Sequence, residues 1–195
     1  MSRSESRTPF PGVTGLLRGA IRTGIAASFA EGIRRRSLGA VMNALIAFGG
    51  AYLLDILERR YTVEFRPWQR IYVETAMLTH AVGMLGPYDD SWWWGNLTHI
   101  HLATVLDGLI HVLARRLGVD PEQRVITGVV TMGILWEFME YSIHASSHRG
   151  GLEPILVSYG KTDTLLDLLS NLVGAVLVLV FGDALLGNLV RREIE

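Results

Sequence analysis

Apolar residues occur in long runs along this chain, separated by short polar segments. Five runs approach the roughly 20 residues that a helix needs to cross a bilayer. They are residues 38–57, 71–85, 92–113, 125–143 and 165–186, of which the second is short. The pattern predicts an all-α fold, a polytopic membrane helix bundle of five or six transmembrane helices.

The N-terminal region leaves the number of spans open. Residues 1–12 are polar and predict a disordered tail. Residues 13–36 predict either an amphipathic helix lying in the membrane interface or a first span whose Arg18 and Arg22 extend toward water. Residues 37–190 predict a single transmembrane helical domain. Apolar positions in the ambiguous segment repeat every four residues, at Leu17, Ile21, Ile25, Phe29 and Ile33.

The distribution of Lys and Arg bears on orientation, because cytoplasmic loops carry an excess of these residues. If residues 13–36 span the membrane, the loops of the two sides contain 11 and 5 basic residues. That ratio favours six spans with both termini in the cytoplasm. If the segment lies on the surface, the count becomes 9 against 9 and indicates no orientation.

Composition narrows the class of protein. The chain has 195 residues, 49% of them hydrophobic, and a mean hydropathy of +0.29. A net charge of −1 argues against nucleic acid as a partner, since a nucleic-acid-binding surface is basic. The absence of cysteine excludes disulfides and thiolate metal sites. We therefore expect a multi-pass protein of the cell membrane whose partner is the lipid bilayer, and the oligomeric state does not follow from the sequence.

Ionisable residues are predicted to collect at one depth of the bundle. Consecutive spans alternate in direction, so the loops at 86–91 and 146–162 lie on the same side. With a rise of about 1.5 Å per residue, polar residues of four helices lie about 6–13 Å below that side. They are His80, Asn96, His99, Glu137, Glu140, Asp167 and Asn171, with Asp163 at the mouth of the last helix.

Spacing also predicts which side chains face one another. Asp163, Asp167 and Asn171 are four residues apart and share one helix face. Gly174 continues this face and would let a neighbouring helix approach closely. In the helix predicted over residues 92–113, His101 points away from His99, because residues two apart do not share a helix face.

The charges of this layer need compensation. A carboxylate at membrane depth must be protonated, paired with a cation or exposed to water. The acids of the layer outnumber the nearby cations, Lys161 and Arg149. A divalent metal ion would supply the missing charge, and histidine with carboxylate is ordinary ligation for Zn²⁺, Mn²⁺ or Fe²⁺. Protonated carboxyls with internal hydrogen bonds, or polar residues that only join helices, are the alternatives.

The leading hypothesis assigns roles within this layer. The proposed metal ligands are His99, Glu137, Asp163 and Asp167, and Glu140 is the proposed general base. His80, Asn96 and Asn171 are expected to support the ligands through hydrogen bonds. Polarised water could then hydrolyse a lipid-linked substrate. A small proton-linked transporter and a structural or accessory membrane protein are the alternative functions. Outside this layer, we interpret Asp107 and His111 as structural and Asp183 as interfacial.

Three segments resemble a known family. The order WGNLTHIHLATVL, ILWEFMEYS and YGKTDTLLDLLSNLVGAV resembles the YjdF-type and VanZ-like integral membrane proteins over about residues 70–180. The resemblance implies a bundle of about six membrane helices and carries no specific biochemistry. The YjdF-type pattern tends to have Asp four residues before the histidine, where this chain has Gly95. The matching positions are His99, Glu137, Glu140, Asp163 and Asp167.

Overall fold

A computed structural model describes residues 11–61, 63–152 and 154–190 of the chain. Throughout these residues the only regular secondary structure is helical, which confirms the all-α expectation. Residues 1–10 of the expected tail lie outside the described residues, and the first helix begins at Pro11. The helices are α1 (Pro11–Arg35), α2 (Leu38–Arg60), α3 (Pro67–Gly83), α4 (Pro87–Asp90), α5 (Trp94–Leu117), α6 (Pro121–Arg149) and α7 (Lys161–Val190).

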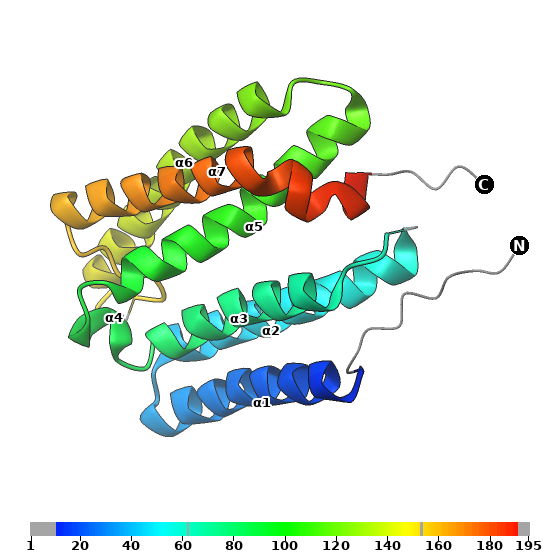
Figure 1. Ribbon diagram of the computed structural model, residues 1–195. Helices are drawn as coiled ribbons and strands as arrows, with labels where there is room; N and C mark the ends of the chain where they lie inside the picture. The colour runs from blue at the N-terminus through cyan, green and yellow to red at the C-terminus, as the bar shows by residue number, and fades with distance from the viewer. Residues whose placement is uncertain (1–10, 62, 153, 191–195) are drawn as a thin grey trace, which may run out of the picture.

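The six long helices run alternately up and down, in two groups of three (Figure 1). Helices α1, α2 and α3 pack against one another, as do α5, α6 and α7. The two groups are joined through α4 and through contacts between α3 and α5. The connections 84–93 and 150–160 lie at the same end of the bundle, as the alternation of spans predicted.

Local sequence explains where several helices begin and end. The Ser37 side chain accepts a hydrogen bond from the backbone N–H of Ala40 at the start of α2, and Asp120 caps α6 in the same way. Gly118 ends α5 with a left-handed φ of 69°, a conformation that glycine adopts without steric cost. These signals keep the turn between α5 and α6 short, so that the two helices pack antiparallel.

Three described helices, α2, α5 and α7, are long and apolar enough to cross a membrane. All three coincide with predicted spans. Helix α3 has 17 residues and is about 25 Å long. Helices α1 and α6 carry more charged residues than α2, α5 and α7 do. The membrane assignment therefore rests on three helices, and the count of five or six spans stays a prediction.

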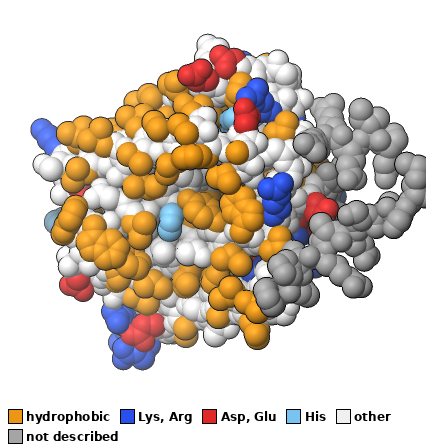
Figure 2. Space-filling view, viewed as in Figure 1, with side chains coloured by type: hydrophobic (Ala, Val, Ile, Leu, Met, Phe, Trp, Pro, Cys, Tyr) orange, Lys and Arg blue, Asp and Glu red, His pale blue; other side chains and the backbone are white. Residues whose placement is uncertain are grey.

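The outer surface of the bundle is largely apolar. Figure 2 shows hydrophobic side chains spread across the middle of the visible face, with charged side chains mostly toward its margins. On α6, for example, Val130, Ile134 and Phe138 are all exposed at four-residue spacing. A soluble monomer rarely exposes so much continuous apolar surface, whereas a surface in contact with lipid is expected to.

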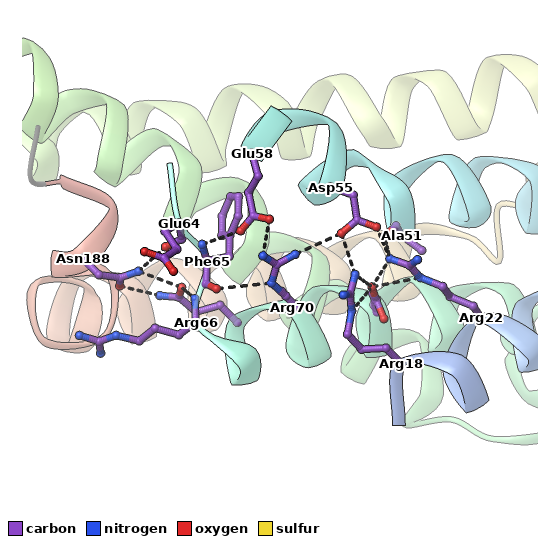
Figure 3. A network of polar contacts seen from close by, with 12 residues as sticks. Arg18, Arg22, Ala51, Asp55, Glu58, Glu64, Phe65, Arg66, Arg70 and Asn188 are labelled. Atoms are coloured by element: carbon purple, nitrogen blue, oxygen red, sulfur yellow. Dashed lines mark hydrogen bonds and ion pairs between the residues drawn. The ribbon is translucent and has the colours of Figure 1, made fainter. Parts of the chain in front are cut away.

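Helix α1 is attached to the bundle by both apolar and charged contacts. Ile21 and Ile25 are buried against α2 and α3. Arg18 and Arg22 bind Glu74 of α3, whose side chain is completely buried. Both arginines also bind Asp55 of α2, which Arg70 of α3 contacts from the other side, as Figure 3 shows. The two arginines that interrupt the apolar pattern of α1 thus face protein, not solvent alone.

Candidate metal site

Close packing of α5 against α7 brings the predicted polar residues together. A Cβ atom placed on Gly174 of α7 would lie 2.7 Å from Cβ of Ala103 on α5. Only glycine leaves enough room for the two backbones to approach this far. The close approach predicted from Gly174 is therefore confirmed, and it places the polar stripe of α7 directly against α5.

His99 is held between two residues of α7. Its Nδ1 atom lies 3.2 Å from Oδ1 of Asn171, and its Nε2 atom lies 3.4 Å from Oδ1 of Asp167. An amide oxygen can only accept a hydrogen bond, so Nδ1 carries the hydrogen. In the neutral ring, Nε2 then presents its lone pair toward Asp167.

Glu137 of α6 completes a group of three possible ligands. One ligand atom from each of His99, Glu137 and Asp167 lies within 4.8 Å of the others. Oε1 of Glu137 is buried and has no hydrogen-bond partner among the described residues. Three helices thus direct one nitrogen and two carboxyl groups at a common point. These are three of the four ligands predicted from the sequence.

Asp163 and Glu140 lie beside this group and are not part of it. Both line the same groove as His99 and Asp167. Asp163 is half-buried one turn before Asp167, at the start of α7. Glu140 is half-buried one turn after Glu137 on α6. The fourth predicted ligand and the predicted base are therefore near the three-residue group but outside it.

His80 and Asn96, two of the predicted supporting residues, have other partners. Nε2 of His80 lies 2.8 Å from Oδ1 of Asn43, and Nδ1 lies 2.9 Å from the hydroxyl of Tyr88. Asn96 accepts a hydrogen bond from the Ser170 hydroxyl and so joins α5 to α7. Of the three residues predicted to support the metal ligands, only Asn171 is hydrogen-bonded to a proposed ligand, His99.

Two further positions of α5 bear on the site. His101 faces Tyr72 of α3, with ring centroids 5.4 Å apart, so it points away from His99 as predicted. A Cβ atom on Gly95 would lie 3.9 Å from Oδ1 of Asp167 and would meet no other atom within 4 Å. Position 95, where the YjdF-type pattern tends to have Asp, therefore faces Asp167.

Glu137, Asp163 and Asp167, which we call the acid group, differ from the charged residues of α1, α2 and α3, because no fixed cation is paired with them among the described residues. Within the described residues, no lysine or arginine forms an ion pair with Glu137, Asp163 or Asp167. In the other network, Arg18 and Arg22 neutralise Glu74 and Asp55 (Figure 3). Sequence reasoning did not single out Glu74, although an acid within the apolar run 71–85 was a signal that could have found it.

The connection between α6 and α7 lies over this end of the bundle. Tyr159 donates a 2.7 Å hydrogen bond to Asp89 of α4, and Asn43 of α2 donates to the carbonyl of Ile155. Burial, together with the Asp89 carboxylate, raises the pKa of Tyr159, and burial raises the pKa of Tyr88. Both phenols therefore remain hydrogen-bond donors at neutral pH.

A large groove extends from the acid group along the bundle between its two halves. It has a volume of about 1290 Å³. His99, Glu140 and Asp167 line it near α4, and most of its remaining length is lined by apolar residues of α2, α3, α5 and α7. The groove therefore combines one polar end with a long apolar body, which is the polarity of an amphiphile.

Comparisons with known proteins agree with a membrane location. The model of a family described as "Predicted membrane protein (DUF2238)" matches residues 16–188. The match includes α2 to α6 entirely and most of α1 and α7. No curated protein and no solved structure matches the chain significantly.

Proposed function

The chain belongs to the predicted membrane protein family DUF2238, and from this premise we propose that it is a multi-pass membrane hydrolase with a divalent metal site. The observation that carries the proposal is the convergence of His99, Glu137 and Asp167, whose ligand atoms lie within 4.8 Å of one another. The same proposal includes the division of the chain into an N-terminal tail and a single transmembrane domain over residues 37–190. It also includes the likeness of the chain to YjdF-type and VanZ-like proteins.

Six spans are part of this proposal. Helix α1 packs lengthwise along α2 and α3 (Figure 1), and its Arg18 and Arg22 are neutralised by Glu74 and Asp55. A paired arginine costs much less at membrane depth than a free one. The outer face of α6 is apolar, while its Glu137 points into the bundle. With six spans, the distribution of basic residues favours both termini in the cytoplasm.

The donor set fits a divalent ion in charge and in type. Two carboxylates and one neutral imidazole together carry two negative charges, which a Zn²⁺, Mn²⁺ or Fe²⁺ ion would balance. The hydrogen bond from His99 to Asn171 supports this assignment, because histidine ligands commonly bind a second residue through the other ring nitrogen. Three protein ligands leave at least one coordination position for water or substrate.

A lipid-linked compound is the proposed substrate. The groove of about 1290 Å³ is apolar for most of its length and would take a hydrocarbon chain. Its polar end would place the head of the substrate beside Asp167 and Glu140. A metal ion there would polarise water for hydrolysis, and Glu140, which lines the same groove, is the proposed general base. Asp163, at the mouth of α7, lines the same groove and is the fourth proposed ligand.

Elemental analysis of the detergent-purified full-length protein tests the metal site. We expect one equivalent of a divalent transition metal in the wild type, and loss of that metal in the double variant Glu137→Gln/Asp167→Asn. A wild type without stoichiometric metal, at equal folding as judged by circular dichroism, would sink the metal hypothesis. Hydrolysis is tested separately, by incubating metal-loaded protein with lipid phosphates in nanodiscs and measuring the released phosphate.

A proton-linked transporter is the second proposal, because the acids have no fixed cation to pair with among the described residues. Without a metal, such acids could bind and release protons. Proton-linked uptake into vesicles that is lost in the same double variant would favour this function over hydrolysis. If the double variant only lowers thermal stability, the polar residues join helices and neither activity is present.

A further inference from the structure

A buried acid lies in the wall of the groove well away from the metal site. Asp107 is near the middle of α5, its side chain is completely buried, and it lines the groove. Neither of its carboxyl oxygens has a hydrogen-bond partner among the described residues. An ionised carboxylate without a partner is strongly disfavoured in such a position, so this group is stable as a neutral acid carrying its proton.

The next turn of α5 provides a second buried group without a full set of partners. His111 is four residues after Asp107 and on the same helix face, and it is 2% exposed. Its Nδ1 atom is buried and has no hydrogen-bond partner among the described residues. Its Nε2 atom lies 3.0 Å from Oδ1 of Asp183 on α7. One ring nitrogen is thus available on the buried side while the other contacts an acid.

Asp183 connects this pair to water. Its side chain is 64% exposed, and Arg115 of α5 binds both of its oxygens. That ion pair holds the carboxylate in place beside the imidazole. A Cβ atom on the neighbouring Gly182 would lie 3.2 Å from the His111 ring, so glycine is needed for the ring to lie against α7.

We propose that Asp107, His111 and Asp183 form a proton path between the apolar groove and water at the end of the bundle where α5 meets α6. The ligand of this site is a proton. The site shares no residue with the His99, Glu137 and Asp167 group and does not depend on a metal. It gives the groove an acid whose proton can be exchanged without opening the bundle.

The other groups around the path leave this role to the three residues. Arg115 is bound to Asp183, and Arg116 donates to the carbonyl of Leu189. From α3, the Tyr72 hydroxyl lies 2.5 Å from that of Thr104, and Gln69 binds Leu185 and Asn188. The residues of α6 that are buried against α7 beside this region are apolar, Val125 and Val129. Among the described residues, no other acid is therefore placed to exchange a proton with His111.

The transfer balances as a relay. Asp107 and Nδ1 of His111 are not hydrogen-bonded to each other in the structure, so the proposed path includes one water molecule between them. The O–H bond of Asp107 breaks and its proton passes to this water, which gives one of its own protons to the lone pair of Nδ1. The N–H bond at Nε2 breaks and that proton passes to the Asp183 carboxylate and then to water. One proton has left the protein, the imidazole carries its hydrogen on Nδ1, and the Asp107 carboxylate takes a new proton from the groove. Rotation of the ring, or transfer in the opposite direction, restores the first state.

Infrared spectroscopy of the full-length protein in lipid nanodiscs tests the path. The carbonyl band of a protonated carboxyl assigned to Asp107 is the part of the spectrum that disappears in Asp107→Asn. On transfer to D₂O, we expect this band to shift about a hundredfold more slowly in His111→Leu than in the wild type, because a positioned base is lost. Asp183→Asn keeps a hydrogen-bond acceptor beside His111 but removes the carboxylate that takes up the proton, so it should also slow the shift.

The control is Glu122→Gln, which removes an exposed acid at the same end of the bundle and should leave the exchange rate unchanged. Two results would overturn the proposal. One is the absence of any protonated-carboxyl band that Asp107→Asn removes. The other is equal exchange in the wild type and Asp183→Asn, a surface substitution that the fold tolerates even if His111→Leu does not fold.

Discussion

Nε2 of His99 on α5 lies 3.4 Å from Oδ1 of Asp167 on α7, while the Nδ1 atom of the same ring contacts Asn171. The two contacts come from successive turns of a single helix, so α7 sets both the position of the imidazole and the nitrogen that keeps its lone pair. Glu137 approaches the same point from α6.

His99 and His101 form a matched pair of substitutions. We expect His99→Ala to abolish stoichiometric metal binding, because it removes the only nitrogen in the group. His101→Ala should keep the metal, since that ring faces Tyr72. Elemental analysis of both purified variants measures the difference, and equal metal content in the two would contradict the site.

Asn171 should affect metal affinity without being a ligand. Asn171→Leu removes the acceptor that orients His99, and loss of such a partner typically weakens metal binding 10- to 100-fold. Titration of metal-free protein with Zn²⁺, followed by calorimetry, measures the change. The control is Asn96→Leu, which breaks the contact to Ser170 and should lower the melting temperature while leaving affinity unchanged. A reversed outcome for the two variants would argue against the proposed role of Asn171.

Gly95 offers a gain-of-function test. The Cβ atom of an aspartate there would lie 3.9 Å from Oδ1 of Asp167 and would meet no other atom within 4 Å, so its carboxylate could be placed beside the three-residue group. In the presence of a metal, Gly95→Asp should bind more tightly than the wild type, because a fourth ligand is added. Without a metal, the same substitution adds another uncompensated acid and should lower thermal stability. Gly95→Asn, of the same size but uncharged, separates the effect of charge from that of volume.

Gly174 should be essential for the contact of α5 with α7. Gly174→Ala places a Cβ atom 2.7 Å from Ala103, and an extra methyl group in such a contact costs about 1–3 kcal/mol. Gly49→Ala in α2 meets no atom within 4 Å and should be neutral, or stabilising by up to about 1 kcal/mol. Thermal unfolding in detergent compares the two. Equal melting temperatures would mean that the helices do not pack this closely.

Glu74 is predicted to hold α1 against the rest of the bundle. Glu74→Gln removes the buried carboxylate that Arg18 and Arg22 bind. Both arginines keep Asp55 as a partner, so we expect a loss of stability smaller than the roughly 3–5 kcal/mol for breaking an isolated buried ion pair. The exposed Asp90→Asn is the control and should change stability little. If unfolding of Glu74→Gln resembles that of the wild type, the ion pairs with Glu74 contribute little to holding α1.

The sequence pattern predicted more of the polar site than of the contacts that the N-terminal helix α1 makes. The four-residue spacing of Asp163, Asp167 and Asn171 gave one helix face, and Gly174 marked where that face meets α5. In α1, Arg18 and Arg22 left two interpretations open, because their partners are 33 to 56 positions away in the chain. Contacts between residues so far apart in the chain produce no local sequence pattern from which they could be predicted.

The sequence by itself determined that the chain forms long apolar helices of alternating direction, and that several of them carry acids at a similar depth. Both follow from local properties, since hydrophobic runs set helix length and the rise per residue sets depth. Only the tertiary structure decided which polar side chains meet. It placed Glu137 with His99 and Asp167, gave His80 to Tyr88 and Asn43, and left Asp163 one turn outside the group. The physical reason is that helix rotation and spacing depend on packing at single small residues such as Gly174, which act across the bundle rather than along the chain.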